Sequence, residues 1–102
     1  MAGLNSGIAL YQGVCDKQEF TYWVQQALYV MAARGIYQEK NQIANLHGHM
    51  IGYAQIVRDE YNRQLEMEPT ARATGWVELT TIKQFLDYYK PKFEDTMGMM
   101  VA

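Results

Sequence analysis

The stretch Asp16–Gly35, DKQEFTYWVQQALYVMAARG, decides the fold that we expect for this chain. Its apolar residues recur at intervals of three and four, which places them on one side of an α-helix. A helix over Lys17–Arg34 is therefore predicted, with Asp16 and Glu19 as an acidic capping pair at its start and Gly35 in the left-handed position at its end. The apolar stripe consists of Phe20, Trp23, Val24, Ala27, Leu28 and Met31.

The opposite face of this helix carries no charge, because no charged residue occurs between Glu19 and Arg34. A helix face in contact with water normally carries Lys or Glu, so this face is expected to be covered, either by a partner or within the fold. Tyrosine is also among the residue types enriched at protein interfaces. We therefore take Tyr22, Gln26 and Tyr29 as candidate interface residues.

A second helical pattern covers Gln38–Met67 and is stopped by Pro69. Two glycines inside it need a reason, because each costs roughly 1 kcal/mol against alanine in a helix. Either the chain breaks near His47-Gly48-His49, or Ala44, Gly48 and Gly52 form a smooth strip that another helix approaches. We favour one mostly continuous helix, so Gly48 and Gly52 join the candidate interface. Its predicted apolar side is Ile43, Leu46, His47, Met50, Ala54, Val57, Tyr61 and Leu65.

The remaining segments are shorter. Pro69–Gly75 is rich in turn residues and predicts a loop, and residues 76–79 follow it as a short strand or an apolar lid. A third helix is predicted over Thr81–Tyr89, capped by Thr80 or Thr81 and stopped before Pro91. Its core side is Ile82, Phe85, Leu86 and Tyr89.

A length of 102 residues predicts one domain. The expected fold is mainly α: a single-domain helical bundle built on an αα-hairpin, with one long helix and a shorter C-terminal helix. The alternative is an α+β fold in which residues 7–14 and 76–80 pair as two strands. Residues 1–15 are expected to form an N-terminal arm and residues 97–102 a tail, both mobile.

Composition limits the surroundings and the partners of the chain. Apolar residues make up 49% and charged residues 20%, which excludes an intrinsically disordered chain. A net charge of −2 gives no global field that would attract nucleic acid or an anionic membrane. The single cysteine, Cys15, allows no intrachain disulfide, and neither a signal peptide nor a membrane-spanning stretch is evident. We therefore expect a cytoplasmic protein with no membrane association.

The chain carries no motif of a known catalytic chemistry. Phosphate-cradling glycine loops, a nucleophile elbow and paired C-x-x-C cysteines are all missing from the sequence. On a helix His47 and His49 would point about 200° apart, so they could not hold one metal ion. We expect no enzymatic activity, no metal site and no cofactor.

The alternative function is DNA binding by a helix-turn-helix. Arg34 and Gln38 flank the turn between the two helical patterns, and Lys40, Asn41 and Asn45 follow on the second. Amide side chains of this kind read base edges in the major groove. Basic residues are too sparse for the usual contacts to phosphates, however.

The function predicted first is therefore a non-catalytic protein–protein interaction module. It would self-associate or act as a small subunit, adaptor or inhibitor of a larger assembly. Trp76, placed after the loop, completes the candidate interface because tryptophan is enriched at interface hot spots.

Overall fold

The computed structural model describes residues 7–13 and 19–95. The described residues contain helices and no β-strand, so the predicted mainly α fold is confirmed and the α+β alternative is not needed. In chain order the elements are α2 (Phe20–Ala33), α3 (Glu39–Gly48), α4 (Gly52–Glu66), the 3-10 turn η1 (Pro69–Ala71), α5 (Ile82–Lys90) and the π-helical turn η2 (Pro91–Asp95).

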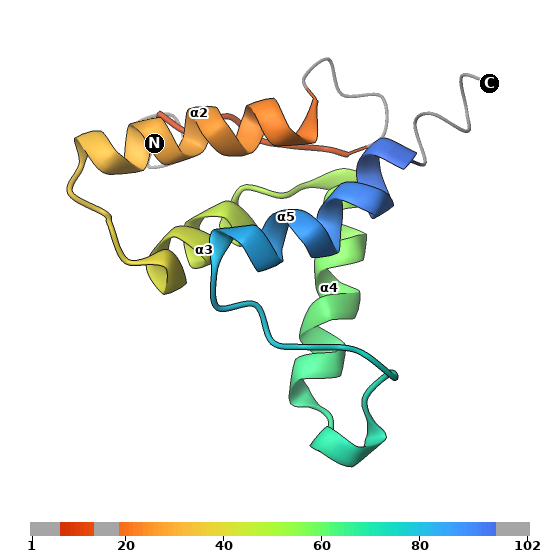
Figure 1. The fold of residues 1–102 in the computed structure, drawn as a ribbon. Coiled ribbons are helices and arrows are strands. Elements are labelled where there is room, and N and C mark those ends of the chain that lie inside the picture. The colour runs from red at the N-terminus through yellow and green to blue at the C-terminus, as the bar shows by residue number, and fades with distance from the viewer. Residues whose placement is uncertain (1–6, 14–18, 96–102) are drawn as a thin grey trace.

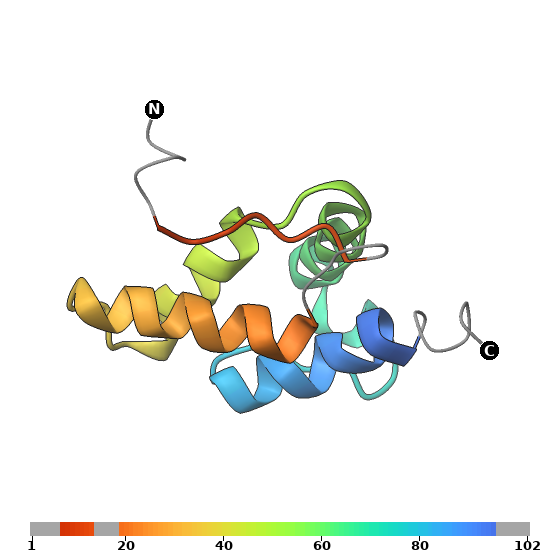
Figure 2. The same ribbon diagram turned by 90° about the horizontal axis from the view of Figure 1, so that it is seen from above.

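Among the described helices, α2, α3 and α5 pack together and α4 leads away from them. Helix α2 lies across one side of the molecule and contacts both α3 and α5, which also contact each other. Helix α4 runs at a steep angle to α2 and carries the chain to the far end (Figure 1). Seen from above, the extended residues 7–13 run beside α2 (Figure 2).

Aromatic rings form the centre of the core. Phe20 on α2 lies 5.8 Å from Phe85 on α5 and 5.2 Å from Phe93 on η2, measured between ring centroids. Tyr11 stacks on Trp23 at 4.8 Å. The Trp23 indole donates a hydrogen bond of 2.7 Å to the Ala9 carbonyl. Part of the expected N-terminal arm, residues 7–13, is thus packed against the core; residues 1–6, 14–18 and the tail lie outside the described residues.

Helix α2 ends as predicted and begins later than predicted. Gly35 has a φ of +78°, and its N–H donates to the Ala32 carbonyl while the Ile36 N–H donates to Met31. These two bonds form the Schellman motif that closes a helix. The helix begins at Phe20 instead of Lys17; Glu19 is its N-cap without a side-chain capping bond, and Asp16 and Lys17 are not described. The predicted stripe is buried, with Leu28 only partly so.

The prediction of one mostly continuous helix over Gln38–Met67 is wrong, because the chain breaks between α3 and α4. At the break Tyr11 donates its N–H to the His49 carbonyl and accepts from the Ile51 N–H, both at 2.9 Å. The Gln12 carbonyl accepts from the Ala54 N–H at 2.8 Å, in the first turn of α4. Backbone groups that a continuous helix would pair internally are therefore paired with residues 11–12, which removes most of the cost of breaking.

The glycines at this break have local reasons of their own. Gly52 begins α4 with a φ of +56°, a conformation that L side chains rarely adopt. Gly48 closes α3 and faces open space. Ala44, Gly48 and Gly52 consequently do not form the smooth strip on one helix that the sequence predicted. The predicted apolar side nevertheless faces the core: Ile43, Leu46, Met50, Ala54 and Tyr61 are buried, and His47, Val57 and Leu65 are half-buried.

The connection from α4 to α5 is held down by side chains. The Arg72 guanidinium donates to the carbonyls of Gln64 and Leu65 in the last turn of α4. The Leu79 N–H donates to the Tyr61 hydroxyl at 2.9 Å, and residues 76–79 form no strand. Helix α5 then starts at a capping box formed by Thr81 and Gln84, as predicted in outline.

Candidate interaction surface

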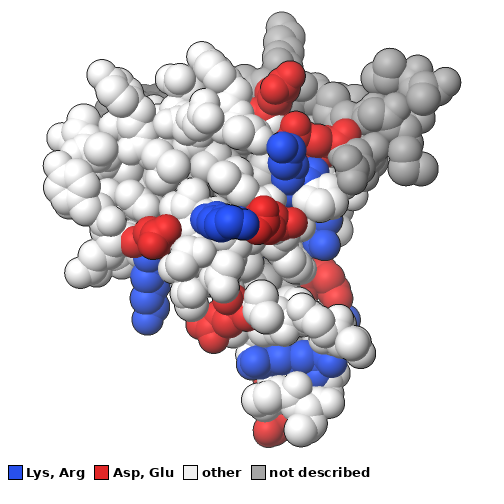
Figure 3. Space-filling view, viewed as in Figure 1, with Lys and Arg blue, Asp and Glu red and all other residues white. Residues whose placement is uncertain are grey.

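The exposed face of α2 is uncharged along its whole length. Tyr22 is 52% exposed and Tyr29 is 75% exposed, and none of the fourteen residues of the helix is charged. Over most of α2 the molecular surface is white in Figure 3, whereas charged side chains gather along α5 and α4. The predicted uncharged face is therefore exposed to solvent in the single chain. Its exposed residues are Tyr22, Gln25, Gln26, Tyr29, Ala32 and Ala33, and we call them the α2 face.

A small groove borders the α2 face. It has a volume of about 210 Å³ and separates α2 from residues 7–9, with Tyr22 and Gln26 on its helical side. Gly7 has a φ of +78°, and a Cβ at this position would lie 3.1 Å from a methyl group of Val30. Glycine thus permits the extended segment to lie close against the helix.

The other candidate interface residues lie elsewhere. Gly48 and Gly52 are exposed at the break between α3 and α4. Trp76 lies in the connection between α4 and α5. The structure therefore brings together Tyr22, Gln26 and Tyr29 and leaves the remaining three outside the α2 face.

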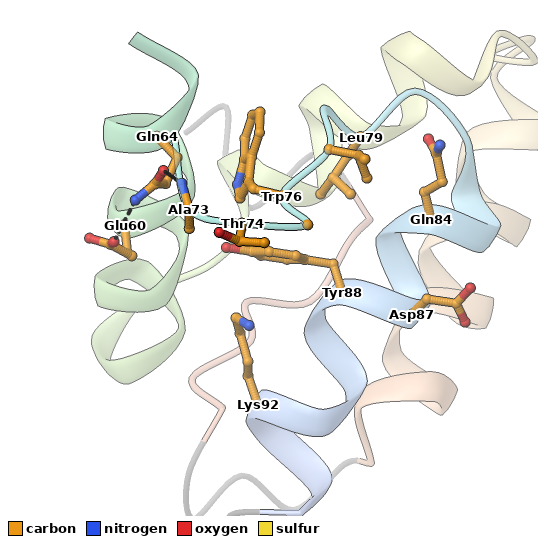
Figure 4. Close-up of a pocket in the computed structure, with 12 residues that line it drawn as sticks. Glu60, Gln64, Ala73, Thr74, Trp76, Leu79, Gln84, Asp87, Tyr88 and Lys92 are labelled. Carbon is orange, nitrogen blue, oxygen red and sulfur yellow. Dashed lines mark hydrogen bonds between the residues drawn. The ribbon is translucent and has the colours of Figure 1, made fainter. Parts of the chain in front are cut away.

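Trp76 lines a cleft that is bordered by residues of α4 and α5. This cleft has a volume of about 540 Å³. Trp76 packs against Tyr61 with 5.3 Å between ring centroids, and the Arg72 guanidinium lies 4.9 Å from the indole centroid. Tyr88 of α5 also lines the cleft, and the Lys92 ammonium lies 4.1 Å from the centroid of its ring (Figure 4). Sequence reasoning missed this cluster because its rings come from three separate segments.

The carboxylates around this cleft are already paired. Two hydrogen bonds from the Arg63 guanidinium, helped by one from Gln64, lower the pKa of Glu60 to about 2. Asp87 accepts from the Lys83 ammonium at 3.0 Å. Burial raises the pKa of Tyr88. The nearby indole N–H of Trp76 opposes that rise, although this N–H has no well-aligned hydrogen-bond partner. The cleft is therefore lined by aromatic rings, and Glu60 and Asp87 at its border are each paired with a cationic side chain.

The two histidines have different partners. His47 Nε2 lies 2.9 Å from the Tyr89 hydroxyl, and burial followed by the positive charge of Arg58 lowers the pKa of His47 to about 4. His49 Nδ1 lies 2.7 Å from the Asn45 carbonyl oxygen. Among the residues that the structure describes, no group of three or more His, Cys, Asp or Glu side chains could hold a metal ion.

The residues of the DNA-binding alternative lie at the corner between α2 and α3. Gln38, Asn41 and Asn45 line a shallow hollow of about 690 Å³, while Arg34 and Lys40 are exposed. Asn41 donates to the Gln38 side-chain oxygen at 3.2 Å, and Asn45 donates to the Asn41 carbonyl at 2.9 Å. Both asparagine amides are thus engaged in local bonds. DNA binding stays a prediction.

Comparison with protein-family models, with curated proteins and with solved structures gave no match for this chain. In the described part of the chain, every helix is too short or too polar to cross a membrane. The α2 face and the cleft beside Trp76 are therefore the features from which a function can be argued.

Proposed function

We propose that this protein is a non-catalytic helical interaction module that self-associates through the α2 face. The observation that carries this proposal is a helix of fourteen residues that exposes two tyrosines and no charge. Covering such a face removes apolar ring surface from water. It requires no charged side chain of α2 to lose its hydration, a loss that would oppose association.

A second copy of the chain suits this face better than a charged partner does. Tyrosine hydroxyls and glutamine amides both donate and accept hydrogen bonds, so Tyr22, Gln26 and Tyr29 are complementary to themselves. A partner with a charged surface would have to bury its charges against a face that has no counter-charge. Among soluble oligomers, two-fold dimers with the same surface on both sides are the commonest.

The expected association is weak. A helix of this length extends over about 21 Å and offers less than the roughly 800 Å² per partner of a standard interface. We therefore expect a dissociation constant roughly in the micromolar range. A monomer–dimer equilibrium at this strength responds to protein concentration.

Sedimentation equilibrium between about 2 and 200 µM tests the proposal, because this range brackets micromolar dissociation. We expect the mass to rise from 11.8 kDa towards twice that value. Tyr29→Glu should weaken the dimer, since it places a charge in the covered face. Tyr37→Glu is the matched control, because Tyr37 is 72% exposed but lies outside α2.

Two results contradict self-association through this face. One is a wild-type mass that stays at the monomer value across the range. That result would favour a different protein as the partner of the α2 face. The other is a dimer that Tyr29→Glu leaves unchanged while Tyr37→Glu disrupts it. Circular dichroism of each variant checks that the helices remain.

A further inference from the structure

We infer that two copies pack α2 against α2 in antiparallel orientation, with the two-fold axis between Gln25 and Gln26. Tyr22 of each copy then contacts Tyr29 of the other. The inferred register rests on the proposed self-association and specifies which residues meet. Three features of the described chain support it.

The first feature is the spacing of the two exposed tyrosines. Tyr22 precedes Gln25 by three residues, and Tyr29 follows Gln26 by three. Seven residues turn an α-helix through about 700°, so both rings project from nearly the same side, about 10.5 Å apart along the axis. When two such helices run antiparallel about the midpoint, each Tyr22 lies at the level of a Tyr29. Aromatic pairs of this kind add to the energy of burial.

The second feature is the charge at the two ends of the face. Exposed Glu19 precedes α2 and exposed Arg34 follows it. Antiparallel packing brings the Glu19 end of each copy beside the Arg34 end of the other, so opposite charges meet. Parallel packing would place like charges together at both ends and would also align the two helix dipoles unfavourably.

The third feature is the pair of amides at the centre. Gln25 and Gln26 are both exposed and lie next to the inferred axis. A residue close to a two-fold axis meets its own copy, so it must be able to bond to itself. A glutamine amide does so, because it carries both donors and an acceptor.

Charge complementation tests the register. Tyr22→Lys and Tyr29→Glu are made singly and together, and the dissociation constant of each dimer is measured by sedimentation. In the inferred register the double variant forms two Lys–Glu pairs. We expect its dimer to be about tenfold tighter than that of either single variant, since coupled neighbours deviate from additivity by such amounts. The control Tyr22→Lys/Tyr37→Glu carries the same charges and should show no such recovery.

The outcomes separate the register from the proposed function. A double variant that associates more weakly than both single variants, by the sum of their separate effects, shows that Tyr22 of one copy does not meet Tyr29 of the other. Parallel packing would give this result, because each substituted position would then face its own copy. This result overturns the register while the wild-type dimer still supports self-association. A wild-type protein that stays monomeric overturns both.

Discussion

His47 on α3 and Tyr89 on α5 are joined by a contact of 2.9 Å between Nε2 and the hydroxyl oxygen. Burial lowers the pKa of His47 and raises the pKa of Tyr89, so both side chains are held in their neutral forms. The Arg58 guanidinium donates to the His47 carbonyl at 2.9 Å and adds a positive charge beside the ring. This contact connects two helices within the core and makes the stability of the fold sensitive to acid.

Acidification should destabilise the protein through His47. Its pKa is about 4 in the folded chain and near 6.5 in the unfolded chain, so the unfolded chain binds the proton more readily. The free energy of unfolding therefore falls as the pH drops from about 6.5 towards 4, by at most about 3 kcal/mol.

Thermal unfolding at pH 7.5 and 5.5 measures about 1.4 kcal/mol of this loss, because these values lie about one pH unit to either side of the free histidine pKa. His47→Gln is the control, because glutamine does not titrate. A wild-type protein and a variant that lose the same stability over this interval would contradict the role of His47.

The two glycines at the break between α3 and α4 should respond in opposite directions to alanine. Gly52→Ala forces a side chain into a φ of +56° and should destabilise the fold by about 1–2 kcal/mol. Gly48→Ala lies at the end of a regular helix and meets open space, so it should stabilise by a few tenths to about 1 kcal/mol. Urea unfolding of both variants decides the matter. If Gly52→Ala were the milder change, the left-handed turn would not be the reason for glycine there.

The capping box of α5 should contribute measurably to stability. The Thr81 hydroxyl accepts from the Gln84 N–H at 3.1 Å. Thr81→Ala should lower the free energy of unfolding by about 1 kcal/mol. Thr70→Ala is the matched control, since Thr70 is exposed in η1. Urea unfolding that shows equal values for both variants would argue against the cap.

The alternative function predicts a different result. We expect no retardation of duplex DNA in a gel-shift assay at about 50 mM salt, because Arg34 and Lys40 provide too few contacts to phosphates. A shift that disappears with Lys40→Ala would favour the DNA-binding alternative instead. Glu39→Ala is a useful comparison, because it removes a neighbouring charge of the opposite sign.

Much of the fold could be predicted because its signals are local. The apolar stripe from Phe20 to Met31 follows the helical period. Gly35 marks the end of the helix because glycine readily adopts the left-handed conformation found there. The capping box at Thr81 depends on residues three positions apart. The α2 face was predicted for the same reason, because absence of charge over one helix is visible in the sequence.

The start of α2 and the cleft beside Trp76 were not predictable in the same way. The N-cap residue Glu19 makes no side-chain capping bond, so the acidic pattern did not mark the first turn. Trp76 meets Tyr61 and Tyr88 only after the α4–α5 connection is folded back. Which aromatic residues meet in the cleft depends on contacts between distant segments, and no local sequence pattern specifies those contacts.

The sequence by itself determined the helical class, the core-facing residues of the predicted helices and the uncharged face of α2, because each depends on spacing within one helix. Only the tertiary structure decided that the chain breaks between Gly48 and Gly52. The backbone groups that the break leaves without helical partners form hydrogen bonds with Tyr11 and Gln12. Those residues are distant in the chain, and no local pattern reports that they will pair with residues 49–51 and with the first turn of α4.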